Sequence, residues 1–391
     1  MKNVERWLKA FAIAFLLEGL GTSIYFTYSR PYIIENLGEA YGLAALLASA
    51  ELIPSIFSVV AGMIGDRIGR RNLILVGILR FPALTLLAYI NPVYAPVAVA
   101  LMYLGTALSA PSSLGTVLEA GGRSGKIYAW ITFFAGIGWA LGGLVPGIFK
   151  QYIGGIGLFL LAGIFLAISP IIQFAYYPKG LKGRSISLQE VFEGIKRSTA
   201  VVLAILFSTA GLTMFYSLLL VKIYREVGNL FIYGLVTMSL AALTGSLMRP
   251  LSGKLVDKYD PDIVLALSLI AYMILNVFLY ISSGLILLVL WLVPIFPFKD
   301  TAQTMSISRR LPPELQATAA GIIATVNSIA GLLIAAVSPE IAAHGLLGGF
   351  IIQLFLLILS IAILYKAYKS AWKNRKVRYN IRGVLSIFNI R

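Results

Sequence analysis

Apolar stretches of about 20 residues recur along almost the whole chain, and they constrain its fold more than any other feature. A helix of that length spans the hydrocarbon core of a bilayer, because each residue adds about 1.5 Å along the helix axis. The sequence therefore predicts an all-α integral membrane protein with twelve transmembrane helices. We place these spans at residues 7–29, 41–64, 72–90, 94–118, 127–149, 154–177, 200–222, 232–255, 263–282, 284–308, 317–338 and 346–368.

The composition favours the same class. Of the 391 residues, 59% are hydrophobic and 12% are charged, whereas soluble globular proteins have about 45–50% apolar and about 25% charged residues. The chain has no cysteine, and His344 is its only histidine, so we expect no metal site and no histidine-based catalytic triad. Residues 120–127 resemble a phosphate-binding loop but lack its first glycine and its final Ser or Thr. We expect neither an enzyme nor a cofactor.

The net charge of +16 follows the predicted topology and does not indicate nucleic-acid binding. Alternate loops and both ends of the chain carry most lysines and arginines, whereas the opposite loops carry only Arg30, Lys150, Lys222 and Arg225. The positive-inside rule then predicts that both termini are cytoplasmic, in a plasma membrane. The basic segment 371–391 is expected to rest on anionic lipid.

The sequence repeats once, at an offset of 191 to 193 residues. Gly62 and Asp66 recur as Gly253 and Asp257, and the segment YGLAAL at 41 recurs as YGLVTM. Parallel repeats of this kind are typical of secondary transporters in which one helix bundle rocks against the other.

The repeat divides the chain into two six-helix bundles, residues 1–178 and 200–370. The polar segment 179–199 is predicted to be a flexible cytoplasmic linker that includes at most a short surface helix.

The segment GMIGDRIGRR resembles the loop between the second and third helices of the major facilitator superfamily, which has the pattern G-x-x-x-D-R-x-G-R-R. The resemblance covers residues 5–370 and implies the fold of that superfamily, in which each bundle consists of two three-helix repeats. In the second copy, Asp260 replaces the second glycine, and Pro261 and Asp262 replace the basic pair. The matching residues of the first copy are Gly62, Asp66, Arg67, Gly69, Arg70 and Arg71.

In the superfamily, an acid at the end of the fourth helix joins this loop, and Glu119 stands there. The resemblance therefore implies a conformational latch of the motif residues with Glu119, closed in the outward-open state and broken when the cytoplasmic side opens. Exposed ion pairs contribute about 0–1 kcal/mol each, which suits a switch. The alternative is a solvated turn that only obeys the positive-inside rule.

Polar side chains at helical spacing mark one face of the first, fourth, seventh and tenth spans. A helix that faces lipid should be apolar all round, so such a face indicates a cavity. The resemblance agrees, because these helices line the central cavity of the superfamily, although helix–helix hydrogen bonding is an alternative for the Ser and Thr residues. The expected cavity residues are Thr22, Tyr25, Thr106, Ser109, Ser113, Thr209, Thr213, Tyr216, Lys299 and Gln303.

Six charged residues lie inside the predicted spans, where an unpaired charge costs about 3 kcal/mol. Glu51 and Arg80 fall near mid-depth on neighbouring spans, and we predict that they form a structural ion pair. Glu18 lies about eleven residues into the first span and is predicted to carry a coupled proton, with Asp300 as the rival.

The leading hypothesis is a monomeric secondary active transporter that exports small organic or lipophilic molecules in exchange for protons. Aromatic residues near the cavity and a lone acid at mid-membrane suit neutral or cationic cargo. The glycine-rich segment 136–147 resembles the fifth helix of antiporters, but Leu144 and Val145 split its usual Gly-Pro pair. The alternative is a proton-coupled symporter that takes up a sugar, an organic acid or another metabolite, with Lys299 meeting an anionic group.

Overall fold

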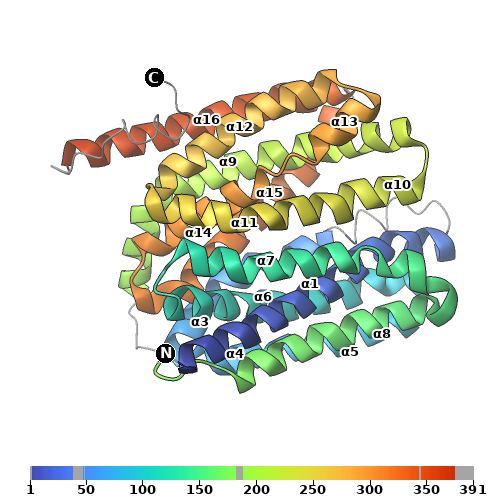
Figure 1. The fold of residues 1–391 in the computed structure, drawn as a ribbon, viewed down its shortest axis with the longest axis horizontal. Coiled ribbons are helices and arrows are strands. Elements are labelled where there is room, and N and C mark those ends of the chain that lie inside the picture. Colours follow the sequence, from blue (N-terminus) through green and yellow to red (C-terminus); the bar gives the residue numbers. More distant parts are fainter. Residues whose placement is uncertain (1, 38–46, 48, 182–187, 343–344, 375–391) are drawn as a thin grey trace.

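The computed structural model describes residues 2–37, 47, 49–181, 188–342 and 345–374, which form a bundle of long helices (Figure 1). Within those ranges the chain contains no β-strand. Eleven helices of the described chain are long and apolar enough to cross a membrane. The predicted all-α membrane fold is therefore confirmed.

The first half of the chain, up to residue 181, is called the N half. Several of its spans contain short 3₁₀ pieces, and Gly69, with φ +105°, separates the second span from the third. In chain order the pieces are α1 (Lys2–Leu37), η1 (Ile53–Phe57), α3 (Ser58–Ile68), α4 (Arg70–Leu75), η2 (Val76–Leu79), α5 (Arg80–Tyr89), η3 (Pro92–Tyr94), α6 (Ala95–Ala120), α7 (Gly125–Gly142) and α8 (Val145–Ala175).

The second half, from residue 188 onward, is called the C half. Its tenth span is broken between Trp291 and Phe296, in a segment that contains Pro294. Its pieces are α9 (Leu188–Val227), α10 (Leu230–Gly234), η4 (Leu235–Leu240), α11 (Ala241–Lys258), α12 (Pro261–Ile281), α13 (Gly284–Trp291), α14 (Phe296–Arg310), η5 (Pro313–Leu315), α15 (Gln316–Ala342) and α16 (Gly345–Asn374).

The fifth predicted span consists of α7 together with the first residues of α8. α7 ends at Gly142, and α8 starts at Val145, with Pro146 in its first turn. α8 itself is broken at Gly154, whose φ of +66° favours glycine. The predicted boundary between the fifth and sixth spans lies at this break.

The predicted linker is partly helical. α9 already begins at Leu188 and continues as one helix of 40 residues through the seventh span. Residues 182–187 of the linker, the repeat segment 41–46 and most of the basic tail (375–391) lie outside the described residues.

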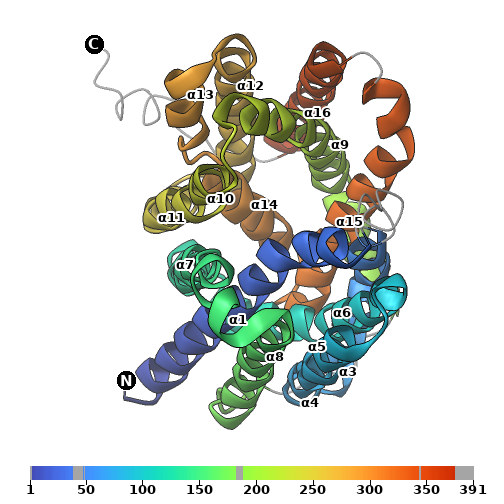
Figure 2. The ribbon, with the colours of Figure 1, turned by 90° about the vertical axis from the view of Figure 1, so that its right-hand side faces the viewer.

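The two halves lie side by side and meet along two seams, α7 with α11 and α15 with α3 and α6 (Figure 2). Glycines bring the backbones close there. A Cβ on Gly62 of α3 would lie 2.3 Å from the Ala317 carbonyl oxygen, and one on Gly253 of α11 would lie 2.5 Å from that of Gly125. Small residues allow this approach of helices inside a membrane.

Candidate functional site

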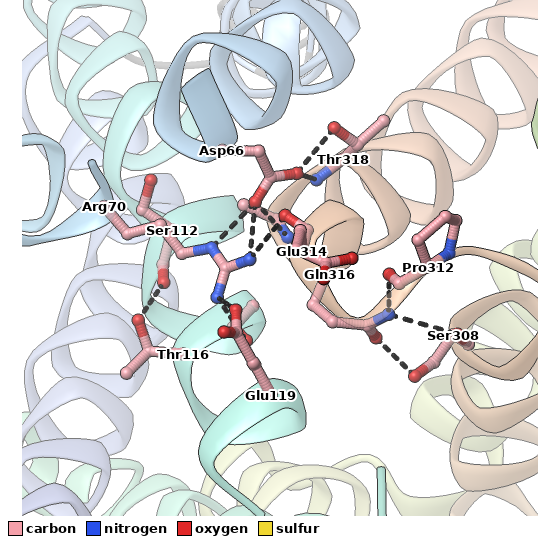
Figure 3. Close-up of polar contacts among 12 residues, drawn as sticks. Asp66, Arg70, Ser112, Thr116, Glu119, Ser308, Pro312, Glu314, Gln316 and Thr318 are labelled. Carbon is pink, nitrogen blue, oxygen red and sulfur yellow. Dashed lines mark hydrogen bonds and ion pairs between the residues drawn. The ribbon is translucent and has the colours of Figure 1, made fainter. Parts of the chain in front are cut away.

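Asp66, Arg70 and Glu119 form a compact cluster, which we call the Asp66 cluster (Figure 3). α3 ends and α4 begins at the end of the molecule where α1 begins and α16 ends (Figure 1). We call this end the termini face. Asp66 lies in the last turn of α3, and Arg70 starts α4 directly after the turn at Gly69. Arg70 Nε donates to Asp66 Oδ1 at 2.7 Å, and Arg70 Nη1 pairs with Glu119 of α6. Because Asp66 and Arg70 are buried, the motif is more than a solvated turn.

The Asp66 carboxylate also reaches the C half, where it caps the N-terminus of α15. It accepts hydrogen bonds from the backbone N–H of Ala317 at 3.1 Å and of Thr318 at 2.7 Å, and from the Thr318 hydroxyl at 2.7 Å. The first N–H groups of a helix have no partner within the helix, and the helix dipole favours a negative charge there. Arg70 Nη2 adds a bond to the Glu314 carbonyl at 2.9 Å.

The other two arginines of the motif are exposed at this face. Arg71 Nε donates to the Phe174 carbonyl at 3.2 Å, and its guanidinium lies 4.2 Å from the Phe174 ring centre, so Arg71 binds α8 of its own half. Arg67 is exposed in the last turn of α3. Among the charged motif residues, Asp66 and Arg70 form the hydrogen bonds that reach the C half in the described chain.

The sequence repeat supplies a second cap in the opposite direction. Asp257 of α11, the repeat partner of Asp66, accepts hydrogen bonds from the backbone N–H of Gly125 at 2.7 Å and of Lys126 at 3.0 Å. These residues begin α7 of the N half. Ser124, the N-cap residue, forms no side-chain cap of its own, and its hydroxyl donates to Asp257 at 3.0 Å. Each half thus caps a helix of the other half.

The ion pair of Arg70 with Glu119 also recurs, with its charges exchanged. In the C half, Asp262 near the start of α12 pairs with Arg310 at the end of α14 through both guanidinium Nη atoms. The two pairs occupy equivalent positions at the repeat offset of 191 to 192 residues. In the sequence, Asp262 stands out only as a departure from the motif. Applying the offset to Glu119 would have found Arg310.

The predicted ion pair between Glu51 and Arg80 is wrong. Arg80 pairs instead with Glu18 of α1, through both Nη atoms, and its Nε donates to the Gly77 carbonyl at 2.9 Å. Glu51 accepts a hydrogen bond from the Tyr25 hydroxyl at 2.7 Å. Equal depth on neighbouring spans does not determine which face of a helix a side chain occupies, and the 3₁₀ segment η2 directly before Arg80 changes that face.

Glu18 is therefore not a lone acid. Ser169 Oγ also donates to its Oε2 at 3.0 Å, Gln173 donates to Ser169 at 3.2 Å, and Ser113 donates to Gln173. This chain of donors from α6 and α8 ends on the Glu18 carboxylate. The expectation of cationic cargo rested on an unpaired acid and loses that support.

The C half contains a second ion pair inside the membrane spans. Arg249 Nη1 lies 2.8 Å from Asp300 Oδ2 and also donates to the Thr132 hydroxyl of the N half at 3.0 Å. Lys299, the neighbour of Asp300, donates to the Thr209 hydroxyl at 3.1 Å and to Gln303 Oε1 at 3.2 Å. Within the described residues, no carboxylate lies within 4.0 Å of the Lys299 amine.

The structure brings together only part of the predicted cavity residues. Thr209, Gln303 and Lys299 form one group, whereas Thr106 and Ser109 donate to the backbone carbonyls of Met102 and Gly105 in their own helix. Thr106 and Ser109 thus form hydrogen bonds within their own helix, a common role of Ser and Thr in membrane helices. The Tyr216 hydroxyl donates to Asn276, and Thr22 and Thr213 are half-buried, so their contact with cargo stays a prediction.

The glycine-rich fifth span serves close packing. A Cβ on Gly138 would lie 2.0 Å from the Leu16 carbonyl oxygen of α1, and one on Gly136 would lie 1.9 Å from Ser246 Oγ of α11. α7 therefore packs against its own half on one side and against the C half on the other.

The sequence matches the family model of the Major Facilitator Superfamily over residues 11–336. The chain belongs to the Major Facilitator Superfamily. No curated protein sequence matches it.

Solved structures with the same transporter fold include the human organic anion transporter MFSD10 (TETRAN), with 13% sequence identity and a TM-score of 0.74. The match covers 92% of this chain and 99% of that one. The E. coli fucose:proton symporter FucP is also similar, with 15% identity, a TM-score of 0.66 and coverage of 92% and 98%. A structure of FucP in the outward conformation gives a TM-score of 0.65, with the same identity and coverage.

Proposed function

We propose that this protein is a proton-coupled secondary active transporter that works by alternating access and exports small organic molecules. The observation that carries the proposal is the reciprocal capping at the termini face, where Asp66 of the N half caps α15 and Asp257 of the C half caps α7. Such contacts can open and close, because water can replace a carboxylate at a helix N-terminus.

Alternating access requires a face that closes when the halves approach and opens when they separate. At the termini face the closure consists of ion pairs and helix caps between close-packed glycines. In our proposal, the Asp66 cluster is the latch of this face, which the distribution of positive charge predicts to be cytoplasmic. The described conformation, with both caps made, then corresponds to a state closed toward the cytoplasm.

We assign proton coupling to Glu18 and its partner Arg80. Protonation of Glu18 would leave Arg80 without its counter-ion, so proton binding would change the contacts between α1, α5 and α8. One charge that crosses the membrane potential contributes about 2.3 kcal/mol per 100 mV, which is enough to drive accumulation more than tenfold. The rival is the Asp300–Arg249 pair, which touches the N half through Thr132.

Substitution of each acid in proteoliposomes tests this assignment, with a cargo identified by thermal-shift screening of the purified protein. Glu18→Gln is expected to abolish accumulation driven by a pH gradient while permitting downhill exchange. Asp300→Asn, the matched control, is expected to retain pH-driven accumulation. Full accumulation by Glu18→Gln together with its loss in Asp300→Asn would move the coupling site to Asp300.

The second candidate function is proton symport that takes up a sugar, an organic acid or another metabolite. Lys299 favours it, because a cation beside neutral partners can bind an anionic group. The direction of the pH gradient separates the two functions. Export in exchange for protons accumulates cargo on the acidic side of the membrane, whereas symport accumulates it on the alkaline side.

A further inference from the structure

Lys299 is a charged residue in the core of the C half, and within the described chain its amine forms no ion pair. It lies eleven residues before Arg310 on α14, or roughly 16 Å along the helix, which places it near the middle of a bilayer. Its amine donates to two neutral groups, Thr209 Oγ1 and Gln303 Oε1. Its neighbour Asp300 is occupied by Arg249. An intramembrane cation in such a setting marks a substrate or ion pathway.

A second group of donors lies farther along the same helix face. Tyr216 follows Thr209 by seven residues on α9, so the two side chains share a face about two turns apart. Tyr216 contacts the rings of Tyr272 and Trp291, and its hydroxyl donates to Asn276 Oδ1 at 2.9 Å. Trp291 Nε1 and Asn276 Nδ2 are buried atoms with no hydrogen-bond partner in the described chain.

The Lys299 amine can only donate, and the unpartnered atoms of Asn276 and Trp291 are donors as well, so a ligand that satisfies both positions must be rich in acceptors. Asn276 is fully buried, and a buried N–H group without an acceptor is costly. The aromatic rings beside these donors offer an apolar surface. The face therefore combines a cation at one end with an aromatic, donor-bearing wall at the other.

We propose that Lys299 binds the carboxylate of the transported molecule, and that the cargo is an organic acid carried as its anion with an aromatic or apolar body. The body packs against Tyr216, Tyr272 and Trp291. Thr209 and Gln303 hold the amine in place until the carboxylate arrives, and Asn327, which accepts a hydrogen bond from Thr209 at 3.0 Å, orients the threonine hydroxyl. This inference rests on the proposed function as a secondary transporter, holds for export and for uptake alike, and narrows the cargo to anions.

Binding to the purified full-length protein tests the inference without any gradient. The probes are arylalkyl carboxylates from benzoate to 6-phenylhexanoate, each compared with its primary amide and the corresponding amine. At least one carboxylate is expected to bind more tightly than both of its neutral and cationic counterparts. Lys299→Gln should weaken that carboxylate about 10- to 100-fold, because a charge-assisted hydrogen bond contributes about 1.5–3 kcal/mol, and should change amide binding little.

Three further variants keep the outcome interpretable. Lys299→Arg keeps the positive charge and should retain the preference for carboxylate over amide. Lys222→Gln removes a lysine of the same half whose amine binds the Tyr280 and Ser282 carbonyls, and should leave the preference unchanged. Trp291→Phe should weaken the acid and its amide equally, because it removes a donor beside the body of the cargo.

The inference is overturned if no carboxylate binds better than its amide, or if Lys299→Gln keeps the full preference. These outcomes are separate from a failure of the proposed function, which would be seen as absence of proton-driven accumulation in proteoliposomes for a molecule that binds.

Discussion

The two caps at the termini face are built alike but lie in different surroundings. The Asp66 side chain is 0% exposed and that of its partner Arg70 is 5% exposed. The Asp257 side chain is 21% exposed, and its partner Arg309, which lies 2.8 Å away, is 32% exposed. Because water screens charges, a carboxylate–arginine pair of the same geometry contributes much more to the stability of the closed state at Asp66 than at Asp257. The N half thus supplies the strong cap of the pair.

The two halves also differ in how many arginines serve the cap and the nearby ion pair. In the N half, Arg70 alone serves Asp66, Glu119 and the Glu314 carbonyl. In the C half these tasks are divided, since Arg309 binds Asp257 and Arg310 binds Asp262. A single arginine that joins Asp66, Glu119 and Glu314 couples them, whereas two arginines leave the cap and the ion pair independent.

The largest effect is expected for Asp66→Asn. The substitution keeps the size of the side chain but leaves the buried Arg70 with one carboxylate fewer, a loss of about 3–5 kcal/mol from the closed state. Transport in proteoliposomes should fall at least tenfold while cargo binding is retained. Because the chain has no cysteine, spin labels on cysteines introduced at Arg67 and Pro313 can report the separation of the halves. Equal losses of binding and transport would indicate misfolding and defeat the latch.

An exchange of charges between Asp262 and Arg310 should show most clearly that the ion pairs of the two halves behave differently. Asp262→Arg or Arg310→Asp alone should each lower transport about tenfold, and the double substitution should restore most of it. The equivalent exchange in the N half, Arg70→Glu with Glu119→Arg, should stay inactive because the glutamate introduced in place of Arg70 would face Asp66. Thermal unfolding of the purified variants provides the check on folding. Rescue in both halves would show that Arg70 has no role beyond its pair with Glu119.

The smallest effect is expected for Asp257→Asn, because this cap is partly solvated. Transport should fall about two- to threefold, consistent with an exposed ion pair of about 0–1 kcal/mol. The deficit relative to the unmodified protein should shrink at high ionic strength, where screening already weakens the Asp257–Arg309 pair. Transport rates at low and high salt provide the measurement. A loss as large as that of Asp66→Asn, independent of salt, would mean that burial does not distinguish the two caps.

Sequence patterns predicted the fold and the members of the Asp66 cluster, but not what the cluster binds. Apolar length defines membrane spans, and the resemblance to the superfamily motif identified Asp66, Arg70 and Glu119. The cap on Thr318 joins residues 252 positions apart, so it depends on how the halves dock. No local pattern contains that information.

The prediction that Glu51 pairs with Arg80 was wrong for another reason, which is local and does not depend on how the halves dock. Hydropathy gives the depth of a residue in the bilayer, but the direction of its side chain depends on every turn before it. The 3₁₀ segment η2 and the breaks at proline alter that direction, and neither could be read from the periodicity. Asn276, Asn327 and Trp291 were missed because they belong to none of the motifs or polar helix faces recognised in the sequence.

Because of the reciprocal caps, opening of the termini face requires water to bind the N-terminal amides of α15 and α7. When the halves separate, the backbone amides of Ala317, Thr318, Gly125 and Lys126 lose their carboxylate acceptors together. Unpaired amides are costly away from water, so water must enter both helix ends as the carboxylates leave. The opening equilibrium should therefore depend on water activity, and osmolytes excluded from protein surfaces should hold this face closed.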